Sequence, residues 1–383
     1  MSAVHDELLL SKAELAERTA VLWKHELEWV RQHPKPDLGG FHDLMEKELS
    51  SKDNFRLPPI DVAMWPEDVF CAIDVSDPEK FNDQFIELPM EVRASGFEKF
   101  FWGAHNGFAL FCFSFMIFSE EKVDALFLYI ISLVVFGSLI CLFTFVLGRR
   151  AGAVVRFNRQ AQLVHVDKGD GNVAHIPWRH VQPMTCLGTR PSAILRVCAP
   201  EPHARSETNR LTMINRKDAE KINTLFAAPY GIPVTMTDTD HSSVPSNLRR
   251  LEFLRRYMEH GLLAIQPHPA AIEQGLVERA EDFDNPRNIC ATGWAGKYVF
   301  YPIDRAWHYF CLGPWLDKRA RRAAEAFDWS EEVKNLCGRN PDLRGLDPRP
   351  VKSRTDIYYR PDAFSFQMVD RYGRPVSDQK ARW

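Results

Sequence analysis

The chain has no excess of charge of either sign. Its 48 Lys and Arg residues stand against 51 Asp and Glu residues, which leaves a formal net charge of −3. So even a balance provides no bulk attraction to phosphate backbones, and we expect no nucleic-acid partner. Cysteine is also scarce, with 8 in 383 residues, which excludes the disulfide scaffold of a small secreted domain. The length corresponds to roughly two to three folding units of ordinary size.

The common signatures of catalysis and metal binding are missing as well. No CxxC, HExxH or GxSxG pattern occurs, and the turn that begins at Gly169 lacks the Lys-Ser/Thr of a phosphate-binding loop. His165, His175 and His180 fall in neighbouring strand-like segments but do not have the spacing of a zinc site, so we interpret them as surface or core-edge residues. We therefore predict no catalytic, cofactor-binding or metal-binding residues. An enzyme whose site assembles from distant positions is left open.

What the sequence does contain is two long runs without a charged residue. Residues 100–119 and 125–147 hold no Asp, Glu, Lys or Arg, and only Glu120 to Asp124 separate them. About 20 apolar residues in a helix cross the roughly 30 Å core of a bilayer. The pattern predicts a transmembrane helical hairpin over residues 100–148, with a pair of buried helices in a large globular protein as the alternative. His105 and Asn106 make the first run the weaker of the two.

Basic residues beside the runs predict the topology. Arg149 and Arg150 directly follow the second run and are predicted to anchor it to anionic headgroups of the lipid bilayer. Because the loop between the runs holds a single Lys, the positive-inside rule places that loop outside and both termini in the cytoplasm. The predicted localisation is therefore the bacterial inner membrane, as a multi-pass protein.

Short strand-like segments follow the hairpin. Apolar residues alternate with polar ones, and turn-rich segments separate the runs. A helix over residues 218–226 is expected to close this antiparallel β-rich module, residues 151–228. The segment VVRFNRQAQLVHVDKGDGNVAHIPWRHV (154–181) resembles the opening of bacterial pleckstrin-homology-like modules, in which a hairpin precedes a strand with the letters IPW. The expected strands cover residues 154–157, 162–166, 173–178, 184–187, 193–197 and 211–214.

Two further regions flank these elements. Residues 1–99 form an N-terminal cytoplasmic arm, with a helix that begins after Ser11 and ends near Pro34. Residues 246–383 form a mixed α/β C-terminal region, with an amphipathic helix over 247–265 and a basic helix over 315–327. The predicted fold class is therefore an α+β membrane protein: a transmembrane hairpin, a small β-rich cytoplasmic domain and a mixed C-terminal region.

The C-terminal region also supplies the candidate partner surface. Aromatic and Arg residues are enriched where interfaces concentrate their binding energy. The alternative is that the aromatic residues form an ordinary core and that the basic cluster near residue 320 is a solvated helix face. The candidates are Trp294, Tyr298, Trp307, Trp315, Arg319 and Arg322.

A wider resemblance suggests a function. With a hairpin near residue 100, the segment RLPPIDVAMW (56–65) and the IPWRHV strand, the layout resembles uncharacterised proteobacterial two-span membrane proteins encoded near type VI secretion genes. The resemblance implies a non-enzymatic inner-membrane immunity or accessory factor that binds a protein partner, such as a secreted effector, at the cytoplasmic face. The alternatives are a membrane-bound enzyme that acts on lipid or peptide, and a homo-oligomeric membrane scaffold.

Overall fold

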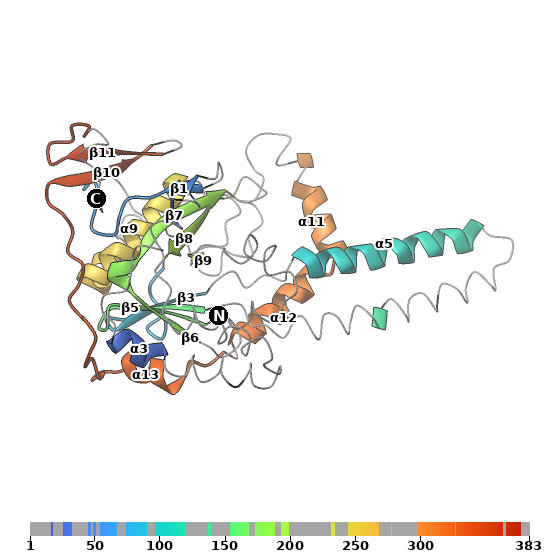
Figure 1. Ribbon diagram of the computed structural model, residues 1–383. Coiled ribbons are helices and arrows are strands. Elements are labelled where there is room, and N and C mark those ends of the chain that lie inside the picture. Colours follow the sequence, from blue (N-terminus) through green and yellow to red (C-terminus); the bar gives the residue numbers. More distant parts are fainter. Residues whose placement is uncertain are drawn as a thin grey trace, which may run out of the picture.

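A computed structural model of the chain shows an α+β fold with three sheets, one central helix and a projecting group of helices (Figure 1). The residues that it describes are 17, 26–32, 45–46, 49–50, 54–66, 74–89, 96–118, 130, 137–138, 154–167, 173–187, 193–198, 231–233, 244–267, 277, 298–299, 301–325, 327–362 and 365–376.

The first sheet consists of four antiparallel strands in the order β3-β4-β5-β6. These are β3 (Phe85–Pro89), β4 (Val154–Asn158), β5 (Leu163–Asp167) and β6 (Val173–Pro177). Because alternate residues of a strand point to opposite faces, the register creates one apolar face and one mixed face. A core-facing row comprises Ile86, Phe157, Val164 and Ile176, and the adjacent row on the other face comprises Glu87, Arg156, His165 and His175.

Two further sheets complete the β structure. The second has the order β1-β7-β8-β9 and is antiparallel throughout, with β1 (Asn54–Arg56), β7 (Gln182–Leu187), β8 (Ala193–Cys198) and β9 (Gly231–Pro233). The third has the order β11-β10-β2, with β2 (Ala63–Met64), β10 (Ile357–Pro361) and β11 (Phe366–Asp370). In the third sheet β10 pairs antiparallel with β11 and parallel with β2. This sheet therefore joins an N-terminal segment to the C-terminal part of the chain.

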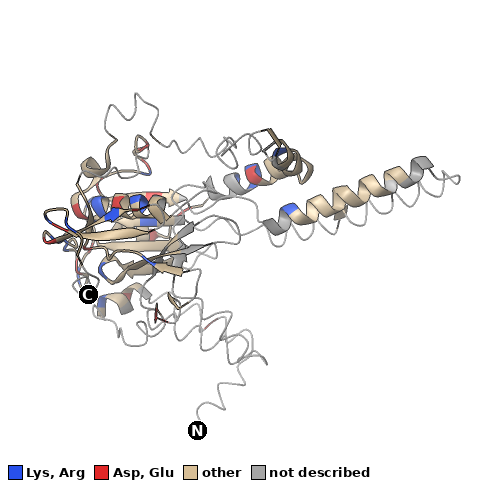
Figure 2. Cartoon of the chain, turned by 90° about the horizontal axis from the view of Figure 1, so that it is seen from above, with Lys and Arg blue, Asp and Glu red and all other residues tan. Residues whose placement is uncertain are grey.

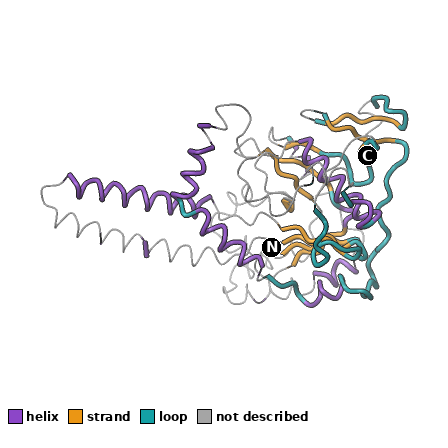
Figure 3. Tube along the Cα trace, turned by 180° about the vertical axis from the view of Figure 1, so that it is seen from behind, coloured by secondary structure: helices purple, strands orange, loops and turns teal. Residues whose placement is uncertain are grey.

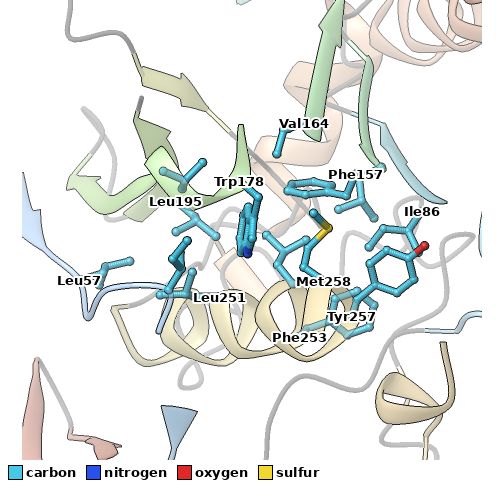
Figure 4. Packing of buried hydrophobic residues seen from close by; sticks show 14 of the residues in the cluster. Leu57, Ile86, Phe157, Val164, Trp178, Leu195, Leu251, Phe253, Tyr257 and Met258 are labelled. Atoms are coloured by element: carbon cyan, nitrogen blue, oxygen red, sulfur yellow. The ribbon is translucent and has the colours of Figure 1, made fainter. Parts of the chain in front are cut away.

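The helix α9 (Val244–His260), which the short helix η2 (Leu262–Ile265) follows, packs against these strands. Apolar residues recur along it at helical spacing, and they bury themselves against both four-stranded sheets. Figure 4 shows Trp178 between Leu195 of β8 and Phe157 of β4, with Leu251 and Met258 of α9 beneath them. The buried side chains that α9 contributes are Leu248, Leu251, Phe253, Leu254, Tyr257 and Met258.

A buried ionic network fastens α9 to the two ends of the chain. The Glu252 carboxylate is fully buried; it accepts hydrogen bonds from the Met64 backbone N–H at 3.0 Å and from the Arg255 and Arg256 guanidinium groups at 2.7 Å. Arg255 also donates to Glu259 at 2.7 Å, and Glu259 accepts a bond from the Ser353 N–H at 3.0 Å. Buried charges need such partners, and here the partners come from β2, α9 and the C-terminal segment.

The C-terminal segment crosses the outside of the molecule. After α13 (Glu331–Leu336) it runs as an ordered loop along the edge of the sheets to β10 (Figures 1 and 3). Leu336, Leu343 and Leu346 pack against Leu27 and Val30 of the N-terminal helix α3 (Glu26–Gln32). Arg179 donates to the carbonyl of Arg349 at 3.1 Å. Segments from both ends of the chain therefore cover the β-rich centre.

The predicted transmembrane hairpin is wrong. No helix among the described residues combines the length and the apolar character needed to cross a bilayer. The helix α5 (Gly96–Phe118) covers the first run, but it includes Glu98 and Lys99 in its first turn and His105 with Asn106 near its middle, and these polar residues lower its apolar character. The predicted fold class of an α+β membrane protein and the multi-pass inner-membrane localisation are corrected accordingly.

Several predicted segments lie outside the described residues. These are the second apolar run apart from Ile130, Gly137 and Ser138, the anchor residues Arg149 and Arg150, the predicted strand 211–214 and the predicted helix 218–226. The strands predicted from residue 154 to residue 197 correspond to β4, β5, β6, β7 and β8. The resemblance to pleckstrin-homology-like modules and the predicted domain boundaries stay predictions.

Candidate functional site

The candidate site lies on three helices that project from the sheets (Figures 1 and 3). The helices α11 (Tyr301–Phe310) and α12 (Gly313–Glu325) follow each other and meet in a tight corner. Leu312 has a positive φ of 55°, and its carbonyl accepts the N–H of Leu316 at 3.0 Å. A Cβ at Gly313 would lie 2.1 Å from the His308 ring, so a side chain at this position would displace that ring.

The helix α5 packs against this corner at a glycine. A Cβ at Gly103 would lie 2.7 Å from the Cys311 sulfur and 3.3 Å from the Trp307 ring, so the absent side chain lets α5 and α11 approach closely. The Asn106 side-chain amide donates to the Phe310 carbonyl. Burial raises the pKa of the Cys311 thiol, which is 1% exposed. Here the polar residue of the apolar run has a specific structural partner on α11.

Charged side chains join α5, α11 and α12 at Asp317. The Lys99 ammonium lies 3.1 Å from one Asp317 oxygen, and the His308 Nε2 lies 3.5 Å from the other. These side chains are one fifth to one third exposed, so water screens the pairs only in part. Beside them, Trp102 of α5 meets Trp315 of α12 edge to face, with ring centroids 6.3 Å apart. The three helices are therefore positioned by polar as well as apolar contacts.

Large apolar side chains remain exposed on this corner. Trp307 and Trp315 are each 54% exposed, and Ile303 is 61% exposed. Folded proteins rarely leave this many large apolar side chains in water without a use for them. We define the aromatic surface by these residues of 298–315: Tyr298, Val299, Ile303, Trp307, Tyr309, Leu312 and Trp315.

The helix α5 extends the apolar exposure beyond the corner. Beyond its first turns it has almost no charged residue (Figure 2). The side chains of Phe100 and Phe111 are 64% and 68% exposed, and those of Phe108, Leu110 and Phe113 are 41 to 56% exposed. Cationic side chains lie next to the aromatic surface: Lys318 and Arg322 of α12 are exposed, and the Arg305 guanidinium lies 5.7 Å from the Tyr309 ring centroid.

The predicted partner-surface residues can now be placed. Tyr298, Trp307 and Trp315 are each more than half exposed, which disfavours the alternative in which they form an ordinary core. Arg322 is exposed and Arg319 is half-buried on the same helix. Trp294 lies outside the described residues.

Sequence reasoning missed the residues that hold the surface together. Gly103 and Asn106 of α5 and Asp317 of α12 join the three helices. The available signal was the polar pair His105–Asn106 within an apolar run, since polar groups in such a place usually have a partner. The partner of Asn106, the Phe310 carbonyl, lies 204 positions away in the sequence, and no local pattern indicates it.

The described residues contain no group of three His, Cys, Asp or Glu side chains placed to hold a metal ion. No family model, curated protein or solved structure matches the chain. Function is therefore inferred from the residues themselves.

Proposed function

We propose that this protein is a binding factor that takes a protein partner on the aromatic surface of α11 and α12. The observation that carries the proposal is the exposure of Trp307, Trp315 and Ile303 on one helical corner, each more than half accessible to water. Trp is the residue type most enriched among those that dominate binding energy. A partner that covers these side chains would remove apolar area from water, which is the main driving force of association.

The charges beside the aromatic surface indicate the chemistry of the partner. Lys318 and Arg322 are exposed at its border on α12. Interfaces commonly surround an apolar centre with a polar rim, and complementary charge in the rim accelerates association. The proposed partner therefore presents apolar side chains flanked by Asp and Glu residues.

The resemblance to proteins encoded near type VI secretion genes would make a secreted effector the partner, and the chain its immunity or accessory factor. That identification stays a prediction. A self-association through the same surface, as in the homo-oligomer alternative, differs from it in one observable respect: the captured molecule would be a second copy of this chain.

Site-specific photo-cross-linking tests the proposal. A photoreactive amino acid replaces Trp307 in the full chain, expressed in its native cells, and the products are identified by mass spectrometry. The matched control places the same group at Tyr372, which is 62% exposed on a turn remote in sequence. The proposal predicts one dominant protein product at position 307, lost when Arg322→Glu is added, and absent at position 372.

Two results would contradict the proposal. One is the same set of products from positions 307 and 372, which would indicate random collisions. The other is a product at position 307 that consists only of this chain, which would favour the oligomeric scaffold.

A further inference from the structure

The outer face of the first sheet carries a row of polar side chains under a cover. Glu87, Arg156, His165 and His175 lie opposite one another on β3, β4, β5 and β6. The segment 327–337, which contains α13, packs over this face: Trp329, Val333 and Cys337 form a buried cluster with Val173 of β6. We name this segment the α13 cover. It buries ionisable groups that sheets usually leave in water.

One half of the row, Glu87 and Arg156, forms an ion pair. Arg156 donates to the Glu87 carboxylate at 2.6 and 3.0 Å, and the Trp329 indole N–H donates to the same carboxylate at 2.7 Å. The Arg156 guanidinium also lies over the Phe85 and Trp329 rings, 4.0 and 4.9 Å from their centroids. Charge, hydrogen bonds and stacking are all satisfied here, so this half is a second attachment of the cover, which release must also break.

The other half is a chain of hydrogen bonds that begins at Asn158. Its side-chain oxygen accepts the N–H of Ala161 at 3.0 Å, and its Nδ2 donates to the carbonyl of Leu336 in α13 at 2.9 Å. These two bonds fix the orientation of the amide. Its Nδ2 therefore faces the His165 Nε2, 3.3 Å away, as a donor. The His165 Nε2 must be the acceptor and carry no proton.

The orientation of the Asn158 amide also determines which ring nitrogens of His165 and His175 carry a proton. A neutral His165 carries its proton on Nδ1 and donates it to the Nδ1 of His175, 2.9 Å away. His175 then carries its own proton on Nε2, which faces the Glu332 carboxylate of α13 at 3.6 Å. Both rings are buried, at 0% and 2% exposure. The chain thus runs in one direction from Asn158 to Glu332 and contacts the α13 cover at both ends.

An additional proton has no acceptable place in this chain. On the His165 Nε2 it would face the Asn158 amide donor, and on the His175 Nδ1 it would face the proton of His165. Among the described residues, Arg156 of β4 acts on His165 and Glu332 of the cover faces His175, while Glu87 of β3 and Cys337 of the cover lie beside Arg156. Burial holds the pKa of His165 well below its usual range, and the neighbouring His175 and Arg156 lower it further. Burial raises the pKa of Cys337 to about 11, so this thiol is neutral near pH 6.

We propose that the His165–His175 pair is an acid-sensitive latch that releases the α13 cover from the sheet when the pair takes up a proton. Release breaks the Asn158–Leu336 and His175–Glu332 contacts together and brings both imidazoles into water, where each can be protonated. The released state exposes Trp329 and Val333, and with them the outer face of the sheet. A fall in pH thereby makes an apolar surface accessible to water.

Hydrogen exchange of the full chain tests the latch. Protection of residues 327–337 is measured by mass spectrometry at pH 7.5 and 5.5, with correction for intrinsic exchange, and residues 244–260 of α9 are the internal reference. An open state in which both histidines have ordinary pKa values gains up to about tenfold in population per histidine and per pH unit below 6.5. We expect protection of the cover to fall about tenfold or more at pH 5.5, while α9 keeps its protection.

Three variants separate a latch from a general effect of acid. His175→Gln leaves one of the two imidazoles and should weaken the pH dependence of the cover, whereas His260→Gln, at an exposed position of α9, should leave it unchanged. Glu332→Gln removes the carboxylate that faces the His175 Nε2. It should match the wild type at pH 7.5 and open a further two- to threefold, roughly, at pH 5.5.

The proposal is overturned if the wild-type cover is equally protected at both pH values, or if His175→Gln retains the wild-type pH dependence. Should His175→Gln fail to fold, Glu332→Gln decides, because this side chain is 47% exposed and its loss leaves the core intact. A wild-type pH profile in that variant would then overturn the proposal.

Discussion

At the scale of single residues, the fully buried side chains explain why the strands could be located from the sequence. Ile176 of β6 and Trp178, which begins the short helix after that strand, are both buried, at 1 to 2% exposure. Trp178 meets Phe157 edge to face, with ring centroids 6.0 Å apart. Within the strands, the alternation of apolar and polar residues defines the core face.

Trp178→Ala should therefore destabilise the fold strongly. Loss of a buried Trp leaves a cavity and removes its apolar contacts, so the free energy of unfolding should fall by about 3–5 kcal/mol in urea denaturation. Leu263→Ala, at a position that is 87% exposed, is the matched control and should change it by less than about 0.5 kcal/mol. Equal stability of the two variants would mean that Trp178 does not belong to the core.

The buried His165 makes the stability of the fold depend on pH. The pKa of His165 is lowered in the folded state, mainly by burial, while the unfolded chain has the ordinary value of 6.5. Below pH 6.5 the unfolded chain binds a proton at His165 that the folded protein does not bind. The free energy of unfolding should therefore be constant above about pH 7 and fall by up to about 1.4 kcal/mol per pH unit below 6.5.

Denaturation curves at pH 8, 7, 6 and 5 measure this slope, and His165→Asn should flatten it. Glu259 contributes only at lower pH: although burial opposes its ionisation, hydrogen bonds from Ser353 and the charge of Arg255 lower its pKa from 4.5. A slope unchanged in His165→Asn would assign the effect to another group.

At the scale of elements, local patterns located most of the strands from residue 154 to 197 but not their long-range partners. The pairing of β3 with β4 joins Leu88 to Val155, and all of α5 lies between them in the sequence. Neither strand has a sequence pattern that indicates the other as its partner. At the C-terminal side, residues 371–376 form a turn against β11, where the Val376 N–H donates to the Met368 carbonyl. Paired Asp and Arg side chains, such as Asp370 and Arg374, order a segment that composition alone describes as loop.

The position of the helix α9 depends on its buried ion pairs. Glu252→Gln keeps the shape of the side chain but leaves Arg255, which is 6% exposed, with less opposing charge. The free energy of unfolding should fall by about 3 kcal/mol or more, because the buried charge of Arg255 is then opposed by Glu259 alone. Glu331→Gln is the control: this carboxylate is 81% exposed beside Lys334, and its loss should cost less than about 1 kcal/mol. Similar values for both variants would contradict a structural role for the α9 network.

The contact of α5 with α11 can be tested at its glycine. Gly103→Val places a side chain where a Cβ already lies 2.7 Å from the Cys311 sulfur, so the two helices must separate. Cys311 should then react about tenfold faster with a thiol reagent, as followed by peptide mass spectrometry. Gly107→Val is the matched control on the same helix, because a Cβ there meets nothing within 4 Å. Equal labelling of Cys311 in both variants would exclude the close approach.

At the scale of the whole molecule, one core gathers residues from Leu57 to Met368, and both ends of the chain contribute to it. The membrane prediction failed at this scale. An uncharged run was interpreted as a span, whereas α5 includes charged and polar residues that contact α11 and α12. Trp307 and Trp315, candidates for the partner surface, are exposed, and their role stays a prediction; the contacts that support them depend on the tertiary structure.

The central claim is that the aromatic surface binds a protein partner, and a direct measurement of affinity tests it. The protein captured at position 307 is purified and titrated calorimetrically with the wild-type chain, with Trp307→Ala/Trp315→Ala and with Tyr372→Ala. If the two tryptophans carry the interface, the double variant raises Kd by about 30-fold or more, while Tyr372→Ala leaves it unchanged. An unchanged Kd for the double variant, with wild-type stability in urea, would contradict the account.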